Sequence, residues 1–294
     1  MTQIPAASNH DLVREHARIR LRSRILRRRD VFIWAAAILF LNHLYSVIKG
    51  FPSVSLEAWL ADLGAIGIFQ YLAWYVIFRL LAESERVPEA RPRDLAAVIV
   101  FCLPVFLPAG QAIWIAATAI AAYAWWFNAG DRKLRAAAIV LAALSVQELW
   151  GHIFFNLIAF HLLRAEAAAV GAVLDVLRPG TEWRDNVVTG PNGYGIMIIN
   201  SCSSFHNLSL ALLCWVTVSR MWRQDWRRRD FAFAAVVGIT MILFNVVRLC
   251  LMGWNVALYH FWHDGLGAEL YAIAASLTVL AISLYAARPD GRPT

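Results

Sequence analysis

A short polar stretch, residues 199–207, holds the side chains of this sequence that are best suited to chemistry. Six of its nine residues are polar, although the chain continues from it as an apolar run. Because an unpartnered polar group is costly in an apolar environment, such a stretch indicates a wet cavity or a reactive site. It contains one thiol, Cys202, and one imidazole, His206. A cysteine thiolate is a strong nucleophile, so nucleophilic catalysis is the chemistry to test first.

Three residues further along the chain could complete a site around Cys202. His263 could act as a base and then as the acid that protonates a leaving amine. Arg248 could stabilise an oxyanion in a poorly solvated site. Asn245 lies three residues before Arg248, on the same face of a helix, and could orient a member of the site by hydrogen bonding. Ser203 and His206 are further supporting candidates.

Each of these residues also has a plain structural interpretation. Cys202 could be a small apolar filler inside a membrane protein, and Arg248 could extend from a helix end to the interface. His260 and His263 lie in a segment rich in Trp and Tyr that could anchor the chain at the membrane surface. His206 lies four residues after Cys202, so a local Cys–His pair is a competing arrangement.

A second polar pattern lies upstream, where Glu148, His152 and Asn156 recur at every fourth residue. We interpret it as a hydrogen-bonded seam that faces other helices, with a metal site or a proton relay as alternatives. The cysteines show no CxxC pair and no metal-ligand spacing, so we expect no disulfide framework, metal or cofactor. Three of them are expected in the apolar core: Cys102, Cys214 and Cys250.

The composition indicates a membrane protein. Of the 294 residues, 60% are hydrophobic and 16% are charged, whereas soluble domains average about one quarter charged. The net charge of +7 is therefore interpreted as a topology signal, and we expect no nucleic-acid partner. We expect no cleavable signal peptide, because the first apolar run starts near residue 31 without a small-residue cleavage site after it.

The apolar runs predict an all-α polytopic protein with about eight transmembrane helices, since about twenty apolar residues cross a bilayer. Before them, residues 1–30 carry eight Arg and resemble a basic amphipathic segment. Residues 31–163 would hold helices one to five, 164–194 an extracytoplasmic loop with an interfacial helix at 165–177, 195–287 helices six to eight, and 288–294 a cytoplasmic tail. A hairpin is expected around the turn 191–193. The spans are expected near 31–49, 63–82, 95–108, 111–128, 136–163, 195–219, 231–253 and 267–287.

The distribution of cations predicts the orientation. If both termini are cytoplasmic and eight crossings alternate, 22 of the 27 Lys and Arg residues lie inside. Cys202 would then lie about two turns below the outer end of helix six, roughly 10 Å down. Arg248 would lie near the outer end of helix seven, and His263 in the following outer loop. We therefore expect these three residues to meet at the outer face.

Three short motifs in order resemble the exosortase/archaeosortase family: Cys202-Ser-Ser, then Asn245-Val-Val-Arg248, then His263-Asp-Gly-Leu-Gly267. The likeness covers about residues 150–287. Members commonly show Cys-Ser-Gly after an Ala, so Ser201-Cys202-Ser203-Ser204 indicates a divergent subfamily. The resemblance implies Cys202 as the nucleophile, Arg248 as the transition-state stabiliser and His263, rather than His260, as the acid/base.

The family resemblance implies a membrane-embedded cysteine peptidase or transpeptidase in the plasma (inner) membrane, with its site facing the periplasm or exterior. Its partners would be the lipid bilayer and secreted proteins with a C-terminal signal of a short motif, a transmembrane helix and a basic cluster. The alternative from the residues is a polytopic transporter or envelope scaffold whose polar path uses Glu148, His152 and Arg248. A lipid-modifying acyltransferase is less well supported, because the chain has no HxxxxD pattern. The sequence does not set the oligomeric state.

Overall fold

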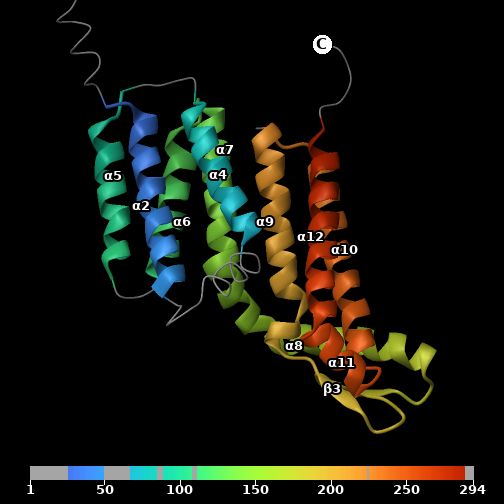
Figure 1. Ribbon diagram of the computed structural model, residues 1–294. Helices are drawn as coiled ribbons and strands as arrows, with labels where there is room; N and C mark the ends of the chain where they lie inside the picture. The colour runs from blue at the N-terminus through green and yellow to red at the C-terminus, as the bar shows by residue number, and fades with distance from the viewer. Residues whose placement is uncertain (1–25, 50–66, 85–88, 108–110, 224, 289–294) are drawn as a thin grey trace, which may run out of the picture.

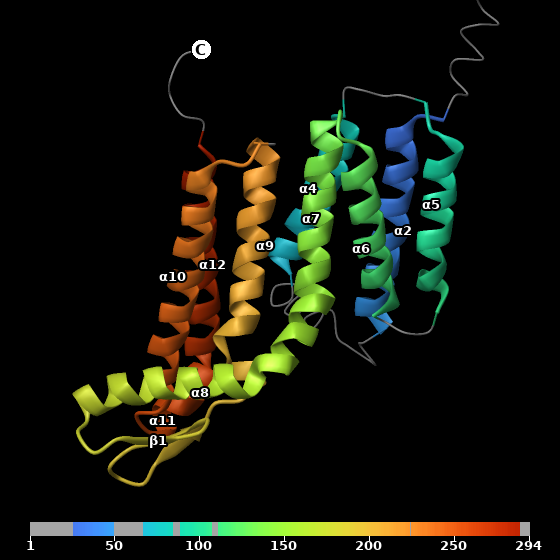
Figure 2. The same ribbon diagram turned by 180° about the vertical axis from the view of Figure 1, so that it is seen from behind.

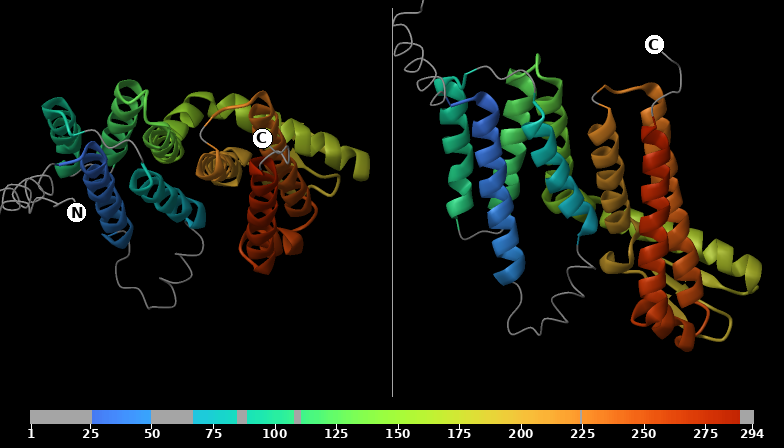
Figure 3. Two further views of the ribbon diagram at one scale, coloured as in Figure 1. Left: turned by 90° about the horizontal axis from the view of Figure 1, so that it is seen from above. Right: turned by 45° about the horizontal axis from the view of Figure 1, so that its top comes forward.

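The computed structural model describes residues 26–49, 67–84, 89–107, 111–223 and 225–288, except the side chains of residues 47–49, Ser201 and His206. Most of the basic segment predicted at 1–30 lies outside the described residues, as does the start of the second predicted span. The described chain is mainly α-helical and forms two helical bundles side by side (Figures 1 and 3).

The N-terminal bundle is built from long apolar helices around a shared core. Its helices are α2 (Arg28–Lys49), α4 (Ile68–Ala82), α5 (Pro92–Cys102), the 3-10 turn η1 (Leu103–Phe106), α6 (Ala112–Phe127) and α7 (Arg132–Ser145). Leu39, Trp74, Ile113 and Leu144 are buried in this core. Asp131 begins α7 by accepting a hydrogen bond from the Leu134 amide, as an N-cap residue does.

The chain turns sharply where α7 ends. A π-helical turn, η2 (Val146–Trp150), is followed by α8 (Gly151–Leu177), which runs crosswise beneath the C-terminal bundle (Figure 2). A β-carbon at Gly151 would lie 2.8 Å from the Val146 carbonyl oxygen, so this tight corner requires glycine. The fifth span predicted at 136–163 is therefore divided between two helices of different direction, and the helix expected at 165–177 begins earlier, at Gly151.

A small sheet follows α8. Strands β1 (Glu182–Arg184), β2 (Val187–Thr189) and β3 (Gly195–Met197) pair antiparallel in that order. Val188 pairs with Ile196, and both side chains are buried against the helices. The β2–β3 pair confirms the hairpin that the sequence predicted. We call the end of the molecule that carries α8 and this sheet the sheet end (Figure 1).

The C-terminal bundle begins with the 3-10 turn η3 (Asn200–Cys202). It continues with α9 (Ser204–Trp222), α10 (Arg228–Met252), the short helix α11 (Val256–His263) and α12 (Leu266–Ala287). Helix α9 packs against α4 and α7 and so joins the two bundles. The segment predicted as an outer loop around residue 260 contains a short helix, which Asn255 caps by accepting a hydrogen bond from the Leu258 amide.

Three stretches of the described chain are long and apolar enough to cross a membrane: Arg132–Leu177, Arg228–Met252 and Leu266–Ala287. Helices Ile68–Ala82 and Ala112–Phe127 are shorter and also apolar. Large apolar side chains such as Trp126, Ile239 and Leu277 are exposed on the bundle surfaces, as a lipid-facing surface requires. These features support the predicted helical membrane protein, while the count of eight spans stays a prediction.

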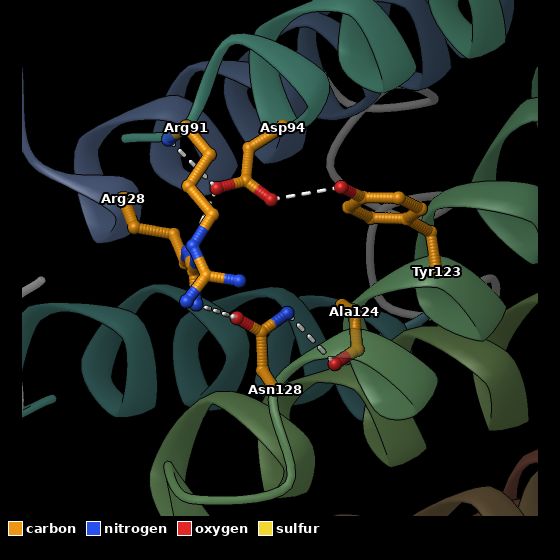
Figure 4. Close-up of polar contacts among 6 residues, drawn as sticks. All are labelled: Arg28, Arg91, Asp94, Tyr123, Ala124 and Asn128. Carbon is orange, nitrogen blue, oxygen red and sulfur yellow. Dashed lines mark hydrogen bonds and ion pairs between the residues drawn. The ribbon is translucent and has the colours of Figure 1, made fainter. Parts of the chain in front are cut away.

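A buried polar network lies where α2 and α5 begin, which is the end of the N-terminal bundle opposite the sheet end in Figure 1. Figure 4 shows its contacts. The Arg28 Nε donates to an Asp94 carboxylate oxygen at 2.7 Å, and Arg28 Nη1 donates to Asn128 Oδ1 at 2.9 Å. The Tyr123 hydroxyl donates to the other Asp94 oxygen at 2.8 Å. The network ties α2, α5 and α6 together.

Candidate active site

Cys202 ends the short turn that leads from the sheet into α9. Its side chain is buried, with the residue 7% exposed, and its amide donates to the Ile199 carbonyl at 2.9 Å. The predicted placement two turns inside a helix is wrong, because Ser203 is extended and caps α9 by accepting from the Phe205 amide. The nucleophile candidate therefore precedes the helix.

The same turn changes the interpretation of His206. The four-residue spacing from Cys202 brings side chains together only within one continuous helix. Here the extended Ser203 interrupts the helical path between the two residues. The side chain of His206 lies outside the described residues, so the local Cys–His pair stays untested.

The backbone amides of residues 202–205 already donate hydrogen bonds within the protein. The Ser203 amide donates to the Asn200 carbonyl at 3.3 Å, and the Ser204 amide donates to Oε1 of Glu166 at 2.6 Å. The amides of Cys202 and Phe205 also have acceptors. These four amides are therefore not free to bind an oxyanion formed at this turn.

A hydrogen-bonded chain from three helices holds the backbone of Cys202. The buried Asn245 side chain, on α10, donates from Nδ2 to the Cys202 carbonyl at 2.9 Å. The Tyr271 hydroxyl, on α12, donates to Asn245 Oδ1 at 3.4 Å and accepts from Asn207 Nδ2, on α9, at 3.2 Å. The sequence indicated Asn245, but it missed Tyr271, which looks like one more aromatic residue in an apolar helix.

Arg248 lies one turn beyond Asn245 on α10. Its Nε donates to the Trp262 carbonyl of α11 at 3.0 Å, and its guanidinium carbon lies 4.9 Å from the centroid of the Tyr271 ring. Arg248 also lines a groove of about 480 Å³ whose other walls are almost entirely apolar. The remaining lining residues are Leu243, Phe244, Val247, Leu251, Trp262, Leu270, Tyr271 and Ala274.

His263 is the last residue of α11 and is oriented by two neighbours. Its ring stacks on Tyr259 with centroids 4.8 Å apart and an interplanar angle of 11°. Its Nδ1 is hydrogen-bonded to the Asp264 carboxyl, an arrangement that fixes the tautomer and leaves Nε2 for proton transfer. His260 lies farther from the same carboxyl, at 3.8 Å, and is more exposed.

The predicted site residues gather at the sheet end, joined through shared neighbours. Cys202 packs in one apolar cluster with Tyr259 and Trp262, the residues that contact His263 and Arg248. Among these described side chains, the Cys202 thiol makes no hydrogen bond to Arg248 or His263.

Tyr194, in the loop after β2, packs against the same apolar cluster as Cys202. Burial raises the pKa of Tyr194, and its hydroxyl donates to the Met252 carbonyl.

The upstream polar pattern is not a straight stripe, because the π-turn and the corner interrupt its periodicity. Glu148 is hydrogen-bonded to Gln70 of α4. His152 and Asn156 instead line a pocket of about 380 Å³ beside the start of α9, together with Asn200. Glu148 therefore ties the π-turn to α4, and the other two residues face the pocket.

Glu166 is a second residue beside the site that sequence analysis missed. It lies in an Ala-rich part of α8, where a glutamate is expected to face solvent, yet it is only 7% exposed. The amide that it accepts from belongs to Ser204, 38 residues away. No local sequence signal marks such a contact.

Comparison with known proteins identifies one family. A model of the transmembrane exosortase family matches residues 59–280 of this chain. Searches of curated proteins and of solved structures gave no match.

Proposed function

Because the chain belongs to the transmembrane exosortase family, we propose that it is a cysteine peptidase or transpeptidase that cleaves the C-terminal sorting signal of secreted proteins. Family membership implies membrane-embedded processing of sorting signals, and the apolar helices suit that setting. The substrate would carry a short motif, a transmembrane helix and a basic cluster. Its acceptor would be water, or an amine or hydroxyl of an envelope glycan or lipid.

The hydrogen bond from Asn245 to the Cys202 carbonyl carries this proposal. It fixes the nucleophile to α10, the helix that also carries Arg248 one turn away. A cation in a rigid, largely apolar setting is suited to meet charge that develops during the reaction. Since the amides of residues 202–205 already have acceptors, Arg248 is the donor that we assign to the oxyanion.

The reaction proceeds through a thioester. His263 Nε2 takes the thiol proton as the Cys202 sulfur attacks the scissile carbonyl carbon. A C–S bond forms, and the carbonyl electron pair moves to an oxyanion that Arg248 stabilises. His263 Nε2 protonates the leaving nitrogen as the C–N bond breaks, releasing the C-terminal helix with a new amine. The acceptor then attacks the thioester carbonyl, and the Cys202 thiolate leaves.

The apolar groove beside Arg248 supports lateral access. It lies between α10 and α12 and exposes apolar side chains such as Leu243 and Leu270. A substrate helix diffusing in the bilayer could reach Arg248 there without leaving the apolar phase. We place the sheet end at the outer face of the plasma membrane, toward the periplasm or exterior, because this orientation puts most Lys and Arg inside.

Substitution of the thiol tests the proposal. The variants Cys202→Ala and Cys202→Ser should abolish shortening of a co-expressed secreted protein that ends in a transmembrane helix and basic cluster, while membrane accumulation stays normal. Cys250→Ala is the matched control, since Cys250 is buried in the same cluster and should be dispensable. Full processing by both Cys202 variants would refute the proposal.

One observation keeps a transport or scaffold function as the alternative. Gln70 of α4 bonds both Gln147 and Glu148 of η2, and Gln147 also lines the pocket that His152 and Asn156 share. A polar path there would make Glu148→Gln harmful and Cys202→Ala harmless. The opposite pattern supports the peptidase.

A further inference from the structure

The buried carboxyl of Glu166 has an unusual arrangement beside the Cys202 turn. One oxygen, Oε1, accepts from the Ser204 amide at 2.6 Å. Within the described part of the chain, the other oxygen, Oε2, has no hydrogen-bond partner although it is fully covered. The hydroxyl of Ser204 is likewise buried without a partner there. Burying a hydrogen-bonding atom without a partner costs free energy, so the choice of a carboxyl at this position needs a reason.

A structural role alone would be served better by glutamine. A glutamine oxygen could accept from the Ser204 amide in the same way, and its NH₂ group could donate to the bare Ser204 hydroxyl. A carboxylate instead keeps a second acceptor oxygen, Oε2, buried beside the turn that carries Cys202. This favours an incoming group that brings a proton to be taken.

The surroundings of Glu166 connect it with the proposed site. Its carboxyl and the Arg248 guanidinium both lie within electrostatic range of the Tyr271 hydroxyl, which bonds the Asn245 that holds Cys202. None of the described cations lies within salt-bridge distance of Glu166, so no ion pair in this part of the chain engages its carboxyl. A base beside a thioester requires both proximity and an uncommitted oxygen.

The two proton-handling groups come from different sides of the molecule. Helix α8, with Glu166, lies behind α11 in Figure 1 and in front of it in Figure 2. His263, on α11, is oriented by Asp264 and Tyr259. The leaving amine would be protonated on the α11 side, whereas the acceptor would enter on the α8 side. The acceptor therefore does not compete with the leaving group for the same space.

Resting on the proposed function, we propose that Glu166 is the general base of the second half-reaction. An acceptor X–H attacks the thioester carbonyl, a C–X bond forms, and its proton passes to Oε2 of Glu166. The C–S bond then breaks and Cys202 leaves as a thiolate. The carboxyl then returns the proton to that thiolate, which restores the resting thiol.

The variant Glu166→Gln separates this role from folding, because it keeps the acceptor for the Ser204 amide. In membranes with a co-expressed substrate, Glu166→Gln should still cleave the sorting signal once and then retain the substrate as a thioester on Cys202. We expect the adduct to rise at least about tenfold and free product to fall about 100-fold, within the range of lost general-base catalysis. Neutral hydroxylamine, a strong nucleophile, should release the product as a hydroxamate.

Asp175→Asn is the matched control on the same helix. Its carboxyl caps the amides of Gly180 and Thr181 and is exposed, so wild-type turnover and adduct levels are expected. Release by Glu166→Gln at the wild-type rate would overturn the assignment. So would loss of cleavage without any adduct, because Glu166 would then act before the thioester forms. If Cys202→Ala also processes the substrate, the proposed function itself fails.

Discussion

Asn245 shows how one amide can set the position of a nucleophile. It is fully buried, and it donates to the carbonyl of Cys202 while accepting from the Tyr271 hydroxyl. Because amide oxygen and nitrogen have opposite hydrogen-bonding roles, both contacts specify its orientation. The residue is therefore the link between the Cys202 turn and the helix that carries Arg248.

Asn245→Asp should slow processing about tenfold to 100-fold. The aspartate can still accept from Tyr271, but it cannot donate to Cys202, whose buried carbonyl is left unpaired at a cost of about 1–3 kcal/mol. The rate of substrate shortening per unit of membrane enzyme measures the effect. Asn207→Ala, which removes only the hydrogen bond from Asn207 to the Tyr271 hydroxyl, should slow processing less. Equal rates for Asn245→Asp and wild type would contradict this account.

At the scale of elements, the sheet is held to α8 by a close approach at Gly171. A β-carbon there would lie 2.5 Å from the ring of Trp183, on β1. Glycine costs about 1 kcal/mol in a helix interior relative to alanine, so its presence serves the packing. The sheet, in turn, leads directly into the Cys202 turn.

Gly171→Ala should therefore lower thermal stability despite the better helix former. Gly238→Ala is the matched control, because its β-carbon would meet only the flexible tip of Leu208 at 3.2 Å. It should leave the melting temperature of purified protein unchanged or raised. Adding Trp183→Ala should restore the stability of Gly171→Ala. Equal melting temperatures for the two glycine variants would exclude the clash.

Apolar runs bounded by polar or turn residues were predictable from sequence. The expected helix at 111–128 is α6, Ala112–Phe127, and the one at 267–287 is α12, Leu266–Ala287. A separate interfacial helix was expected at 165–177, but the corner at Gly151 that starts α8 was not predictable, because the apolar run 136–163 has the composition of one continuous span. Contacts such as Glu166 with Ser204 depend on that corner. The cysteine, arginine and histidine motifs indicated the site, but not the links between them.

At the scale of the whole molecule, the Arg28–Asp94 network and the site occupy opposite ends. Asp94 is fully buried and receives Arg28, Tyr123 and the Arg91 amide. Removing one partner of a buried ion pair leaves an uncompensated charge, which costs about 3–5 kcal/mol. The network therefore concerns assembly of the N-terminal bundle and not the chemistry.

Asp94→Asn should reduce the amount of folded protein in the membrane and leave processing per folded molecule unchanged. Glu83→Gln is the control: its exposed pair with Arg79 lowers the pKa of Glu83, chiefly through the hydrogen bond from Arg79, but exposed pairs stabilise little. Detergent-resistant protein and specific activity should be measured together. A loss of specific activity in Asp94→Asn would show that the two ends are coupled.

The crosswise course of α8 has a mechanical consequence. Its large apolar side chains, including Phe154, Leu157 and Val176, are exposed, while Ala167 and Val170 face the bundle. A helix of this kind takes up area in only one leaflet, as a wedge does. The protein should therefore favour bilayers that curve outward at the sheet end. The lipid composition of that leaflet would then act on α8, the helix that carries Glu166.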